Sequence, residues 1–419
     1  MSGRYGAPRI GRPEMLPALV LGLGTHGLAI VRSLGRRGVR VEVADTAEPA
    51  GPRAHTRYLA AYHPVPSLED ERLVDFLVGW ARCNGSPSVL FLVRDRTVPV
   101  VSRWREELVR LGYRFNLPAP ETVALLMDKT RLPKWLAGQG VPHPRAWVCR
   151  NGDDAQRIGD AVALPCVVKP QRRHPGFKAE LVTHRGRLGD LLQQYAEGPV
   201  AGVVQEWVEG PTRNIRFCFV YIRKDGGLAA AFTGRKVRQL PLDTGVATEM
   251  EPFTDEPLLR RSLELFRAAG YTGFGSTEFK RSSRDGRDYL IEFTVGRTDL
   301  NLAVARTRGV DLPWLAYCDL TGHPADAEVP AGRQGAFAPR RWVDGRRNRR
   351  ALWQELREGR RGAIAVLCSS VRSLDPRNEF ALFAWDDPGP WAAYWASRAR
   401  AAARKGAGWA GALSGAGRS

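Results

Sequence analysis

The chain of 419 residues has no run of about eighteen consecutive apolar residues, the length that a membrane-spanning helix needs. Its first segment, MSGRYGAPRIGRPEM, is basic but is not followed by the apolar stretch of a secretory signal. The six cysteines are scattered singly and form no CxxC pair, so neither a zinc site nor a disulfide framework is indicated. These absences predict a cytoplasmic protein without a membrane partner.

Lysine is scarce: eight of the 63 basic residues are Lys, and the formal net charge is +19. Clustered basic residues can neutralise the phosphates of a nucleic acid. Here they are spread along the chain, and the one dense cluster, 340–350, lacks the interleaved aromatic residues of a single-strand binder. The distribution argues against nucleic acid as a partner, and it makes any Lys at a motif position informative.

Strand and helix patterns alternate over residues 17–116. The apolar segments ALVLGLG, VRVEVAD and SVLFLV predict buried strands, and HGLAIVRSLGRRG and LEDERLVDFLVGWARC predict amphipathic helices. From LPCVVKP onward strands dominate, with hairpin turns at 224–227 and 284–286. The sequence therefore predicts a parallel α/β, Rossmann-like half followed by an antiparallel α+β half.

The last part of the chain, about 331–403, predicts an appended subdomain. Its expected elements are two strands, GAIAVLCSSV and EFALFAW, and a Trp-rich amphipathic helix after the DDPGP turn. Residues 1–16 and 404–419 are rich in Gly, Ser, Ala and Arg without periodicity, and we predict that both are disordered tails. The length of the chain suggests roughly three domains.

A glycine-rich turn lies near the N-terminus. Gly22, Gly24 and Gly27 form a GxGxxG pattern between a strand and a helix, and Asp45 closes the next strand. This is the dinucleotide fingerprint, so an NAD-dependent oxidoreductase is one alternative. However, a tight turn needs glycine wherever backbone approaches a ligand or another element, and many Rossmann-like domains bind no dinucleotide.

Four later segments carry residues suited to a nucleoside triphosphate and a divalent ion. Lys129 begins a helix, and Lys169 ends the apolar strand PCVVK. The segment QEWVEG (205–210) leaves a strand as a linker whose free backbone groups can pair with an adenine edge. Glu278 and Glu292 lie on two strands joined by the RSSRDG turn, and antiparallel pairing would bring both carboxylates to one face, as a divalent ion requires.

The order DK, VVKP, QEWVEG, FTGRKVRQ, EFK and IEFT resembles the ATP-grasp superfamily, in particular its bacterial carboxylate-amine ligases, which include relatives of D-aspartate ligase. The likeness implies an ATP-grasp fold preceded by a Rossmann-like pre-ATP-grasp domain and followed by a small C-terminal extension. The implied boundaries are 17–118 for the first domain, 119–330 for the ATP-grasp domain, about 134–206 for its lid, about 207–330 for its C-terminal lobe, and 331–403 for the extension.

The resemblance also implies ligands and roles. ATP and Mg²⁺ would be the cofactors, and the substrates would be a small-molecule carboxylate and an amine of amino-acid or peptide type. The implied nucleotide-binding residues are Lys129, Lys169, Lys178, Gln205, Glu206, Trp207 and Val208, with Arg172 and Arg173 on a flap. The implied residues near the transferring phosphoryl group or the acyl phosphate are Arg235, Lys236, Arg238 and Arg297. The implied Mg²⁺ ligands are Glu278, Glu292 and Thr294.

One position departs from the family pattern. Thr294 stands where relatives usually have an Asn ligand, and Arg297 is displaced by one position. A Thr hydroxyl can bind Mg²⁺, and Asp299 offers a carboxylate from the same loop. We therefore expect a ligase that forms an amide through an acyl phosphate. A catalytically silent ATP-binding or nucleic-acid-binding protein is the other alternative, and the oligomeric state stays open, with a homodimer as one candidate.

Overall fold

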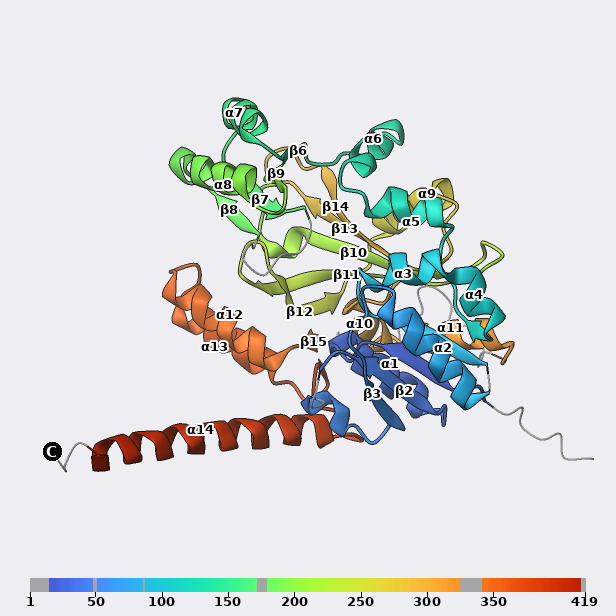
Figure 1. Ribbon diagram of the computed structural model, residues 1–419. Helices are drawn as coiled ribbons and strands as arrows, with labels where there is room; N and C mark the ends of the chain where they lie inside the picture. Colours follow the sequence, from blue (N-terminus) through green and yellow to red (C-terminus); the bar gives the residue numbers. More distant parts are fainter. Residues whose placement is uncertain (1–14, 48–50, 86, 172–178, 325–340, 416–419) are drawn as a thin grey trace, which may run out of the picture.

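The computed structural model describes the chain except for residues 1–14, 48–50, 86, 172–178, 325–340 and 416–419. Figure 1 shows two sheets that form the body, a smaller lid sheet with two helices, and a long C-terminal helix that extends away from the body. No helix in the described part of the chain is long and apolar enough to cross a membrane.

The N-terminal sheet is parallel, as the sequence predicts. Its strands, in spatial order, are β3 (Ala61–Pro64), β2 (Val41–Asp45), β1 (Ala18–Leu21), β4 (Ser88–Leu92) and β5 (Tyr113–Arg114). Its helices are α1 (Thr25–Gly35), η1 (Pro52–His55), α2 (Arg72–Asn84), α3 (Thr97–Arg103) and α4 (Arg105–Arg110). The sequence pattern misses β3 and β5, which are short and lack a continuous buried apolar run.

The lid is an antiparallel sheet with its own apolar core. Its strands, in spatial order, are β6 (Ala146–Cys149), β9 (Gly202–Glu206), β7 (Cys166–Pro170) and β8 (Glu180–Val182), and its helices are α7 (Gly152–Ala161) and α8 (Arg185–Glu197). Two connecting helices, α5 (Pro120–Met127) and α6 (Arg131–Gly138), precede it. Because Leu136 of α6 packs against Phe279 and Leu290 of the body, the lid elements begin after α6, later than residue 134.

The central sheet carries the longest strands. They are, in spatial order, β14 (Asp288–Val295), β13 (Gly273–Arg281), β10 (Ile215–Ile222), β11 (Leu228–Leu240), β12 (Val246–Pro252), β15 (Trp342–Val343) and β16 (Glu379–Phe380). The accompanying helices are η2 (Thr212–Asn214), α9 (Glu256–Ala268), α10 (Asn301–Arg306) and α11 (Leu312–Thr321). All neighbours from β14 to β15 are antiparallel, so the predicted antiparallel half is confirmed.

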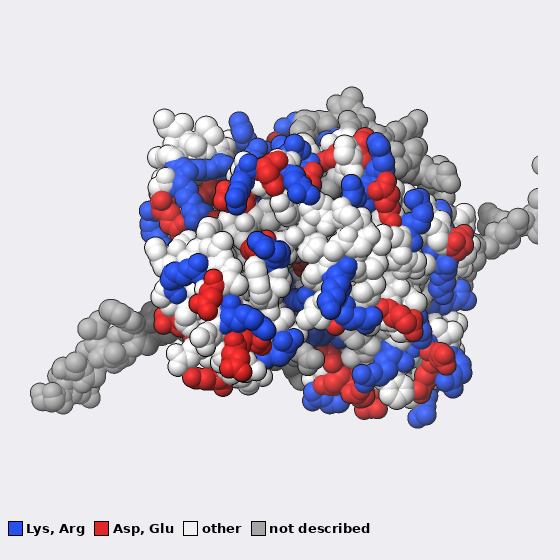
Figure 2. All heavy atoms as spheres, turned by 90° about the horizontal axis from the view of Figure 1, so that it is seen from above, with Lys and Arg blue, Asp and Glu red and all other residues white. Residues whose placement is uncertain are grey.

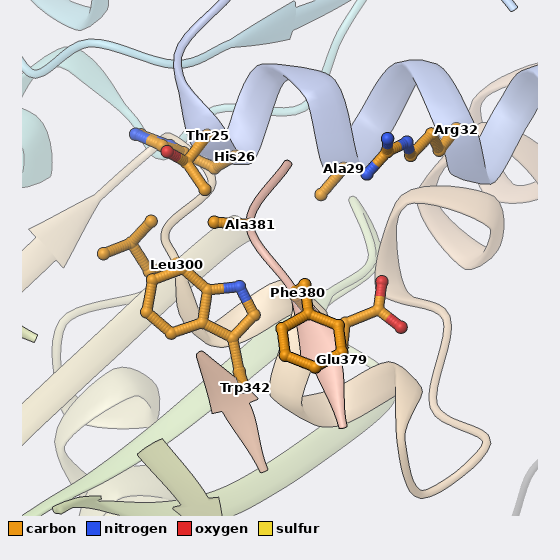
Figure 3. A pocket seen from close by; sticks show the side chains of 10 residues that line it. Thr25, His26, Ala29, Arg32, Leu300, Trp342, Glu379, Phe380 and Ala381 are labelled. Atoms are coloured by element: carbon orange, nitrogen blue, oxygen red, sulfur yellow. The ribbon is translucent and has the colours of Figure 1, made fainter. Parts of the chain in front are cut away.

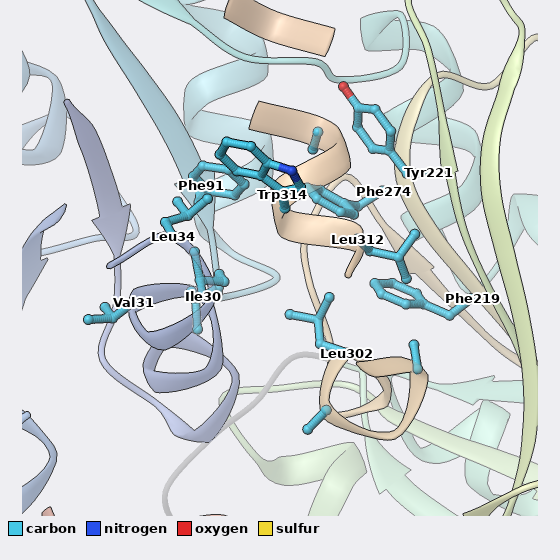
Figure 4. Packing of buried hydrophobic residues seen from close by; sticks show 14 of the residues in the cluster. Ile30, Val31, Leu34, Phe91, Phe219, Tyr221, Phe274, Leu302, Leu312 and Trp314 are labelled. Atoms are coloured by element: carbon cyan, nitrogen blue, oxygen red, sulfur yellow. The ribbon is translucent and has the colours of Figure 1, made fainter. Parts of the chain in front are cut away.

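One apolar cluster joins the N-terminal sheet to the central sheet. Figure 4 shows Ile30 and Leu34 of α1 beside Trp314 of α11, with Phe219 and Phe274 of the central sheet on the far side. The last two rings stack with centroids 6.1 Å apart. Because this packing is continuous, the glycine-rich turn before α1 is held in a fixed place relative to β13 and β14.

The C-terminal region differs from the sequence prediction in three places. GAIAVLCSSV forms helix α13 (Ala363–Ser373) and not a strand, because a short apolar run does not distinguish the two. EFALFAW contributes only the two residues of β16. The helix after DDPGP, α14 (Gly389–Gly415), continues through most of the predicted tail at 404–419. Helix α12 (Gly345–Arg357) precedes α13, and the predicted tail at 1–16 lies almost entirely outside the described residues.

The DDPGP segment ties the C-terminal region to the N-terminal domain. Asp387 is buried and accepts hydrogen bonds from Arg32 Nε at 2.8 Å, Thr56 Oγ1 at 2.6 Å and the backbone N–H of Arg57 at 2.9 Å. Gly389 approaches the backbone so closely that a Cβ there would lie 2.2 Å from the carbonyl oxygen of His55. A buried carboxylate with three donors fixes this segment in one geometry.

Candidate active site

The glycine-rich turn uses its glycines for backbone geometry. Gly22 has a φ of 113°, which only glycine adopts readily, and a Cβ on Gly27 would lie 2.2 Å from the carbonyl oxygen of Gly22. The Asp45 carboxylate accepts the backbone N–H of Leu23 at 2.7 Å and also pairs with Arg94. The carboxylate that would bind a ribose in a dinucleotide site is thus already engaged by the protein.

We therefore expect no dinucleotide binding at this turn. Addition of NADH or NADPH at micromolar concentration should leave the tryptophan fluorescence of the protein unchanged, because Asp45 is occupied by Leu23 and Arg94. Quenching that saturates at micromolar nucleotide would contradict this expectation and would revive the oxidoreductase alternative.

The two predicted metal-binding carboxylates face each other. Glu278 of β13 and Glu292 of β14 are direct partners in the antiparallel register. Lys236 Nζ on β11 donates to Glu278 Oε2 at 2.7 Å. Burial and the negative charge of Glu278 raise the pKa of Glu292 to about 7. The positive charge beside the pair is thus too small to stabilise both carboxylates in their ionised form.

Thr294 lies two residues beyond Glu292 on the same strand. Its side chain is buried, and Oγ1 donates to Asp299 Oδ2 at 3.4 Å. In the described part of the chain no group of three or more His, Cys, Asp or Glu side chains is arranged to hold a metal. Mg²⁺, however, is commonly held by one or two carboxylates together with substrate phosphates, so the pair of facing carboxylates fits this ion.

The two predicted phosphate-binding lysines lie together opposite these carboxylates. Lys169 Nζ donates to Gln205 Oε1 at 2.9 Å, and Lys129 Nζ donates to the carbonyl oxygen of Gln171 at 3.1 Å. Burial and the charge of Lys129 lower the pKa of Lys169, whereas Glu292 opposes this shift. Within the described residues neither lysine is hydrogen-bonded to a carboxylate, and two such neighbouring cations are suited to a polyanion.

The linker after β9 only partly matches its predicted role. Glu206 accepts the backbone N–H of Arg145 at 3.0 Å and Arg145 Nε at 2.7 Å, so its carboxylate is held at the edge of the lid sheet. Val208 is buried, and the Trp207 ring lies 3.6 Å from Lys280 Nζ. The backbone of 205–208 therefore remains a candidate for binding the base, whereas the Glu206 side chain does not.

Lys280 of β13, whose ammonium lies against Trp207 of the linker, is a residue that the sequence reasoning missed. It is buried, and burial lowers its pKa to about 8. The available signal was its position two residues after Glu278, on the same face of β13, in a chain with few lysines.

Arg235 and Arg238, two of the predicted arginines, lie on β11 and make different contacts. Arg235 lies over the Phe253 ring at 4.5 Å and donates to Glu251. Arg238 is 2% exposed and pairs with Glu249, and Nη1 also donates to Asn348 Oδ1 of α12 at 2.9 Å. Arg238 is therefore a structural link between β11 and α12 and is not brought to the site, in contrast to the prediction.

Arg297 connects the site to the N-terminal domain. Its guanidinium pairs with Asp95, which follows β4, and it lies 3.9 Å from Asp299. His26, at the start of α1, approaches the carbonyl oxygen of Thr298 with Nδ1 at 3.1 Å. Sequence reasoning did not single out Asp95 or His26, although a His inside a glycine-rich turn was visible as GLGTHG.

Beside His26 lies a small cavity between α1 and β16. Figure 3 shows Thr25 and His26 on one side of it and Trp342 and Glu379 on the other. Its volume of about 10 Å³ has room for roughly one water molecule, so it is too small for a substrate. Burial and the nearby Arg297 lower the pKa of His26 to about 4, which keeps the ring neutral at pH 7.

This lowered pKa predicts an acid-sensitive fold. Because the folded state disfavours the protonated ring, the contribution of His26 to stability is fully present above pH 6.5 and is lost as the pH falls towards 4. His26→Asn should remove on the order of 2 kcal/mol of this pH-dependent loss, as measured by urea unfolding at pH 7 and pH 4.5. His55→Asn, at an exposed position, serves as control. Equal pH dependence in wild type and His26→Asn would contradict the assignment.

Charged side chains are mixed on the face that Figure 2 displays. Basic and acidic residues alternate around a central area of uncharged side chains. This face shows no continuous basic patch of the kind that a nucleic acid requires. The flap residues Arg172, Arg173 and Lys178 lie outside the described residues, so their predicted role stays a prediction.

Comparisons with known proteins agree with this geometry. No family model matches the chain. It is 30% identical over 199 residues to a formate-dependent phosphoribosylglycinamide formyltransferase from Ignicoccus hospitalis, with 46% of each chain covered. It is 25% identical over 206 residues to a D-alanine–D-alanine ligase from Stutzerimonas stutzeri, with 46% of this chain and 63% of the relative covered. The chain thus matches 46% of the length of the first relative and 63% of the length of the second, which is less than two thirds of either.

The fold has counterparts among solved structures. An N5-carboxyaminoimidazole ribonucleotide synthetase in complex with ADP superposes with a TM-score of 0.59 at 12% identity, covering 84% of this chain and 87% of the other. At this identity the likeness concerns the fold, and it confirms the predicted ATP-grasp architecture. The sequence relatives, the shared architecture and the facing carboxylates and lysines lead to one conclusion: the chain belongs to the ATP-grasp superfamily.

Proposed function

We propose that the protein is an ATP- and Mg²⁺-dependent ligase that joins a carboxylate to an amine. The observation that carries this proposal is the direct pairing of Glu278 with Glu292 opposite Lys129 and Lys169. Two carboxylates facing two lysines, the half-buried Lys169 and the exposed Lys129, form a site for a metal-bound triphosphate, because each kind of group neutralises one part of it.

Each residue has a role set by its position. Lys129 and Lys169 would bind the phosphates of ATP, and the linker backbone at 205–208 would bind the base. Glu278, Glu292 and the Thr294 hydroxyl would hold Mg²⁺, which supplies positive charge beside the transferred phosphoryl group. The Lys236 ammonium, hydrogen-bonded to Glu278, lies where it can also contact an acyl phosphate.

The proposed reaction has two steps. First, a carboxylate oxygen of the substrate attacks the γ-phosphorus of ATP, the bond from that phosphorus to the bridging oxygen breaks, and ADP leaves. Second, the amine nitrogen attacks the carbonyl carbon of the acyl phosphate, inorganic phosphate leaves, and the nitrogen loses a proton. Neither step needs a covalent protein nucleophile, so the residues act by positioning and electrostatics.

Amino acids or small peptides are the substrate class that we propose. A D-alanine–D-alanine ligase is among the relatives, which supports two substrates of amino-acid type. His26 of the glycine-rich turn, Asp95 and Arg297 lie on the side of Glu292 that faces the N-terminal domain, where such a substrate would adjoin the phosphates. We also propose that the working assembly is a homodimer.

Phosphate release in the presence of pooled amino acids tests the function. The full chain with ATP and Mg²⁺ should release phosphate faster when a pool of amino acids and dipeptides is added, and omission of single members should identify the substrates. If the protein binds ATP but releases no phosphate in response to any substrate, the alternative of a catalytically silent ATP-binding protein is favoured. The observation that supports this alternative is Thr294, which stands where relatives usually have an Asn ligand.

A further inference from the structure

Helix α13 turns its polar side inward and its apolar side outward. Ile364, Leu367, Val371 and Leu374 are 80%, 65%, 64% and 76% exposed, respectively. Ser373 is buried. A surface helix in a monomer has the reverse arrangement, with its apolar stripe facing the core.

The orientation of α13 is fixed by hydrogen bonds on its polar side. Ser373 Oγ donates to Glu249 Oε2 of β12 at 3.2 Å and accepts from Asn348 Nδ2 of α12 at 2.9 Å. Arg361 Nη1, just before the helix, donates to Ser369 Oγ at 3.1 Å. Because these contacts hold the serines inward, the apolar side cannot turn into the protein without breaking a buried polar network.

We propose that this apolar stripe, consisting of Ile364, Leu367, Val371 and Leu374, is a two-fold interface on which a second copy of the chain packs its own α13 in antiparallel orientation. The stripe residues are separated by three, four and three residues, a spacing that reads the same in both directions. A two-fold axis therefore places Ile364 opposite Leu374 of the partner subunit and Leu367 opposite Val371 of the partner subunit, so every apolar side chain meets another.

The charges around the stripe are compatible with self-pairing. Arg372 is the one charged residue within α13, and the stripe itself carries none. At the two ends of the stripe the charges are already paired within the chain, because Arg361 lies 3.5 Å from Glu355 and Asp375 lies 2.6 Å from Arg377. Two antiparallel helices also align their dipoles favourably.

The size of the stripe sets the expected strength. Pairing of two stripes with their flanking residues would bury roughly 1,000 Å² in total, about the lower limit for a specific interface. We therefore expect a dimer with a dissociation constant in the micromolar range.

A lipid surface fits the same stripe less well. A helix that lies on a membrane carries Lys and Arg along its polar face, which stays in contact with headgroups and water. In α13 the polar face is occupied by serines that bind Glu249, Asn348 and Arg361 of the same chain. The stripe therefore matches a protein partner with an identical apolar row.

Sedimentation velocity of the full chain tests this interface. The wild type should change from a species near 46.4 kDa to one of twice that mass as its concentration rises through the micromolar range. Leu367→Asp and Val371→Lys should each raise the dissociation constant at least about 100-fold, because each substitution occurs twice in a two-fold interface. Ala365→Asp, at an exposed position on another side of α13, is the matched control.

Thermal unfolding verifies that the variants are folded, which is expected because the changed side chains are exposed. A wild type that stays monomeric at about 100 µM overturns the proposal. If a dimer persists unchanged in both folded stripe variants, the interface does not lie at the stripe on α13, and the proposal is wrong. Flotation of a monomeric wild type with vesicles of phosphatidylserine and phosphatidylcholine, abolished by Leu367→Asp, would assign the stripe to a membrane instead. None of these outcomes depends on the proposed catalytic activity.

Discussion

Lys169→Ala should weaken ATP binding at least about 100-fold, equivalent to about 2.7 kcal/mol, while the fold stays intact. The Lys169 ammonium is half-buried beside Lys129, and among the described residues its hydrogen bond goes to the neutral Gln205 amide, so the positive charge is available to a phosphate. Alanine removes that charge and its hydrogen bonds from a site where water cannot fully replace them. Isothermal titration calorimetry with ATP and Mg²⁺ measures the effect.

Lys129→Ala should have a similar but smaller effect, because Lys129 is less enclosed and contacts the carbonyl oxygen of Gln171. Lys224→Ala provides the control, since Lys224 is exposed in the β10–β11 hairpin turn. Loss of a lysine at this exposed position should leave the affinity for ATP unchanged. If both site variants bind ATP like the wild type, the phosphate-binding role of this pair is wrong.

Glu292→Gln should reduce Mg²⁺-dependent ATP consumption at least about 100-fold, because it removes one of two facing carboxylates and with it both charge and coordination. Burial and Glu278 already raise the pKa of Glu292, which indicates that this position favours an added positive charge. Glu264→Gln, on the exposed face of α9, is a control for loss of a carboxylate elsewhere.

Thr294 decides between an active enzyme and a silent relative. Thr294→Asn should be tolerated, because the amide oxygen is another hard ligand. Thr294→Val keeps the shape but lacks the oxygen, so its half-saturating Mg²⁺ concentration should lie between those of wild type and Glu292→Gln. If Thr294→Val has the Mg²⁺ dependence of the wild type, Thr294 is not a ligand, and Asp299, 3.4 Å from its hydroxyl, becomes the candidate.

The carboxylate pair was predictable because it depends on local order. Two β-rich segments joined by a short Asp-Gly turn must pair in antiparallel fashion, and the register then follows from the turn length. The lysines were informative because lysine is rare in this chain. Both features therefore depend on local order and composition, which can be read from the sequence alone.

Other features depend on long-range packing that the sequence does not display. Arg238 stands two residues from Lys236, yet the register of β11 shifts between them, and the guanidinium turns to Glu249 and α12. The segment of α13 is predicted as a strand because it contains a short apolar run. In the structure it is a helix, and its apolar residues lie on an outer surface and not in the core. Asp95 reaches Arg297 only because α1 and α11 pack the two sheets together.

Transfer of oxygen from the carboxylate to phosphate tests the central claim most directly. Amino acids labelled with ¹⁸O in their carboxylates are incubated with the full chain, ATP and Mg²⁺, and the released phosphate is analysed by ³¹P NMR or mass spectrometry. An acyl phosphate passes one carboxylate oxygen to the phosphate, so we predict inorganic phosphate that carries one ¹⁸O atom. Substrate-dependent phosphate without label would contradict activation of a carboxylate by ATP.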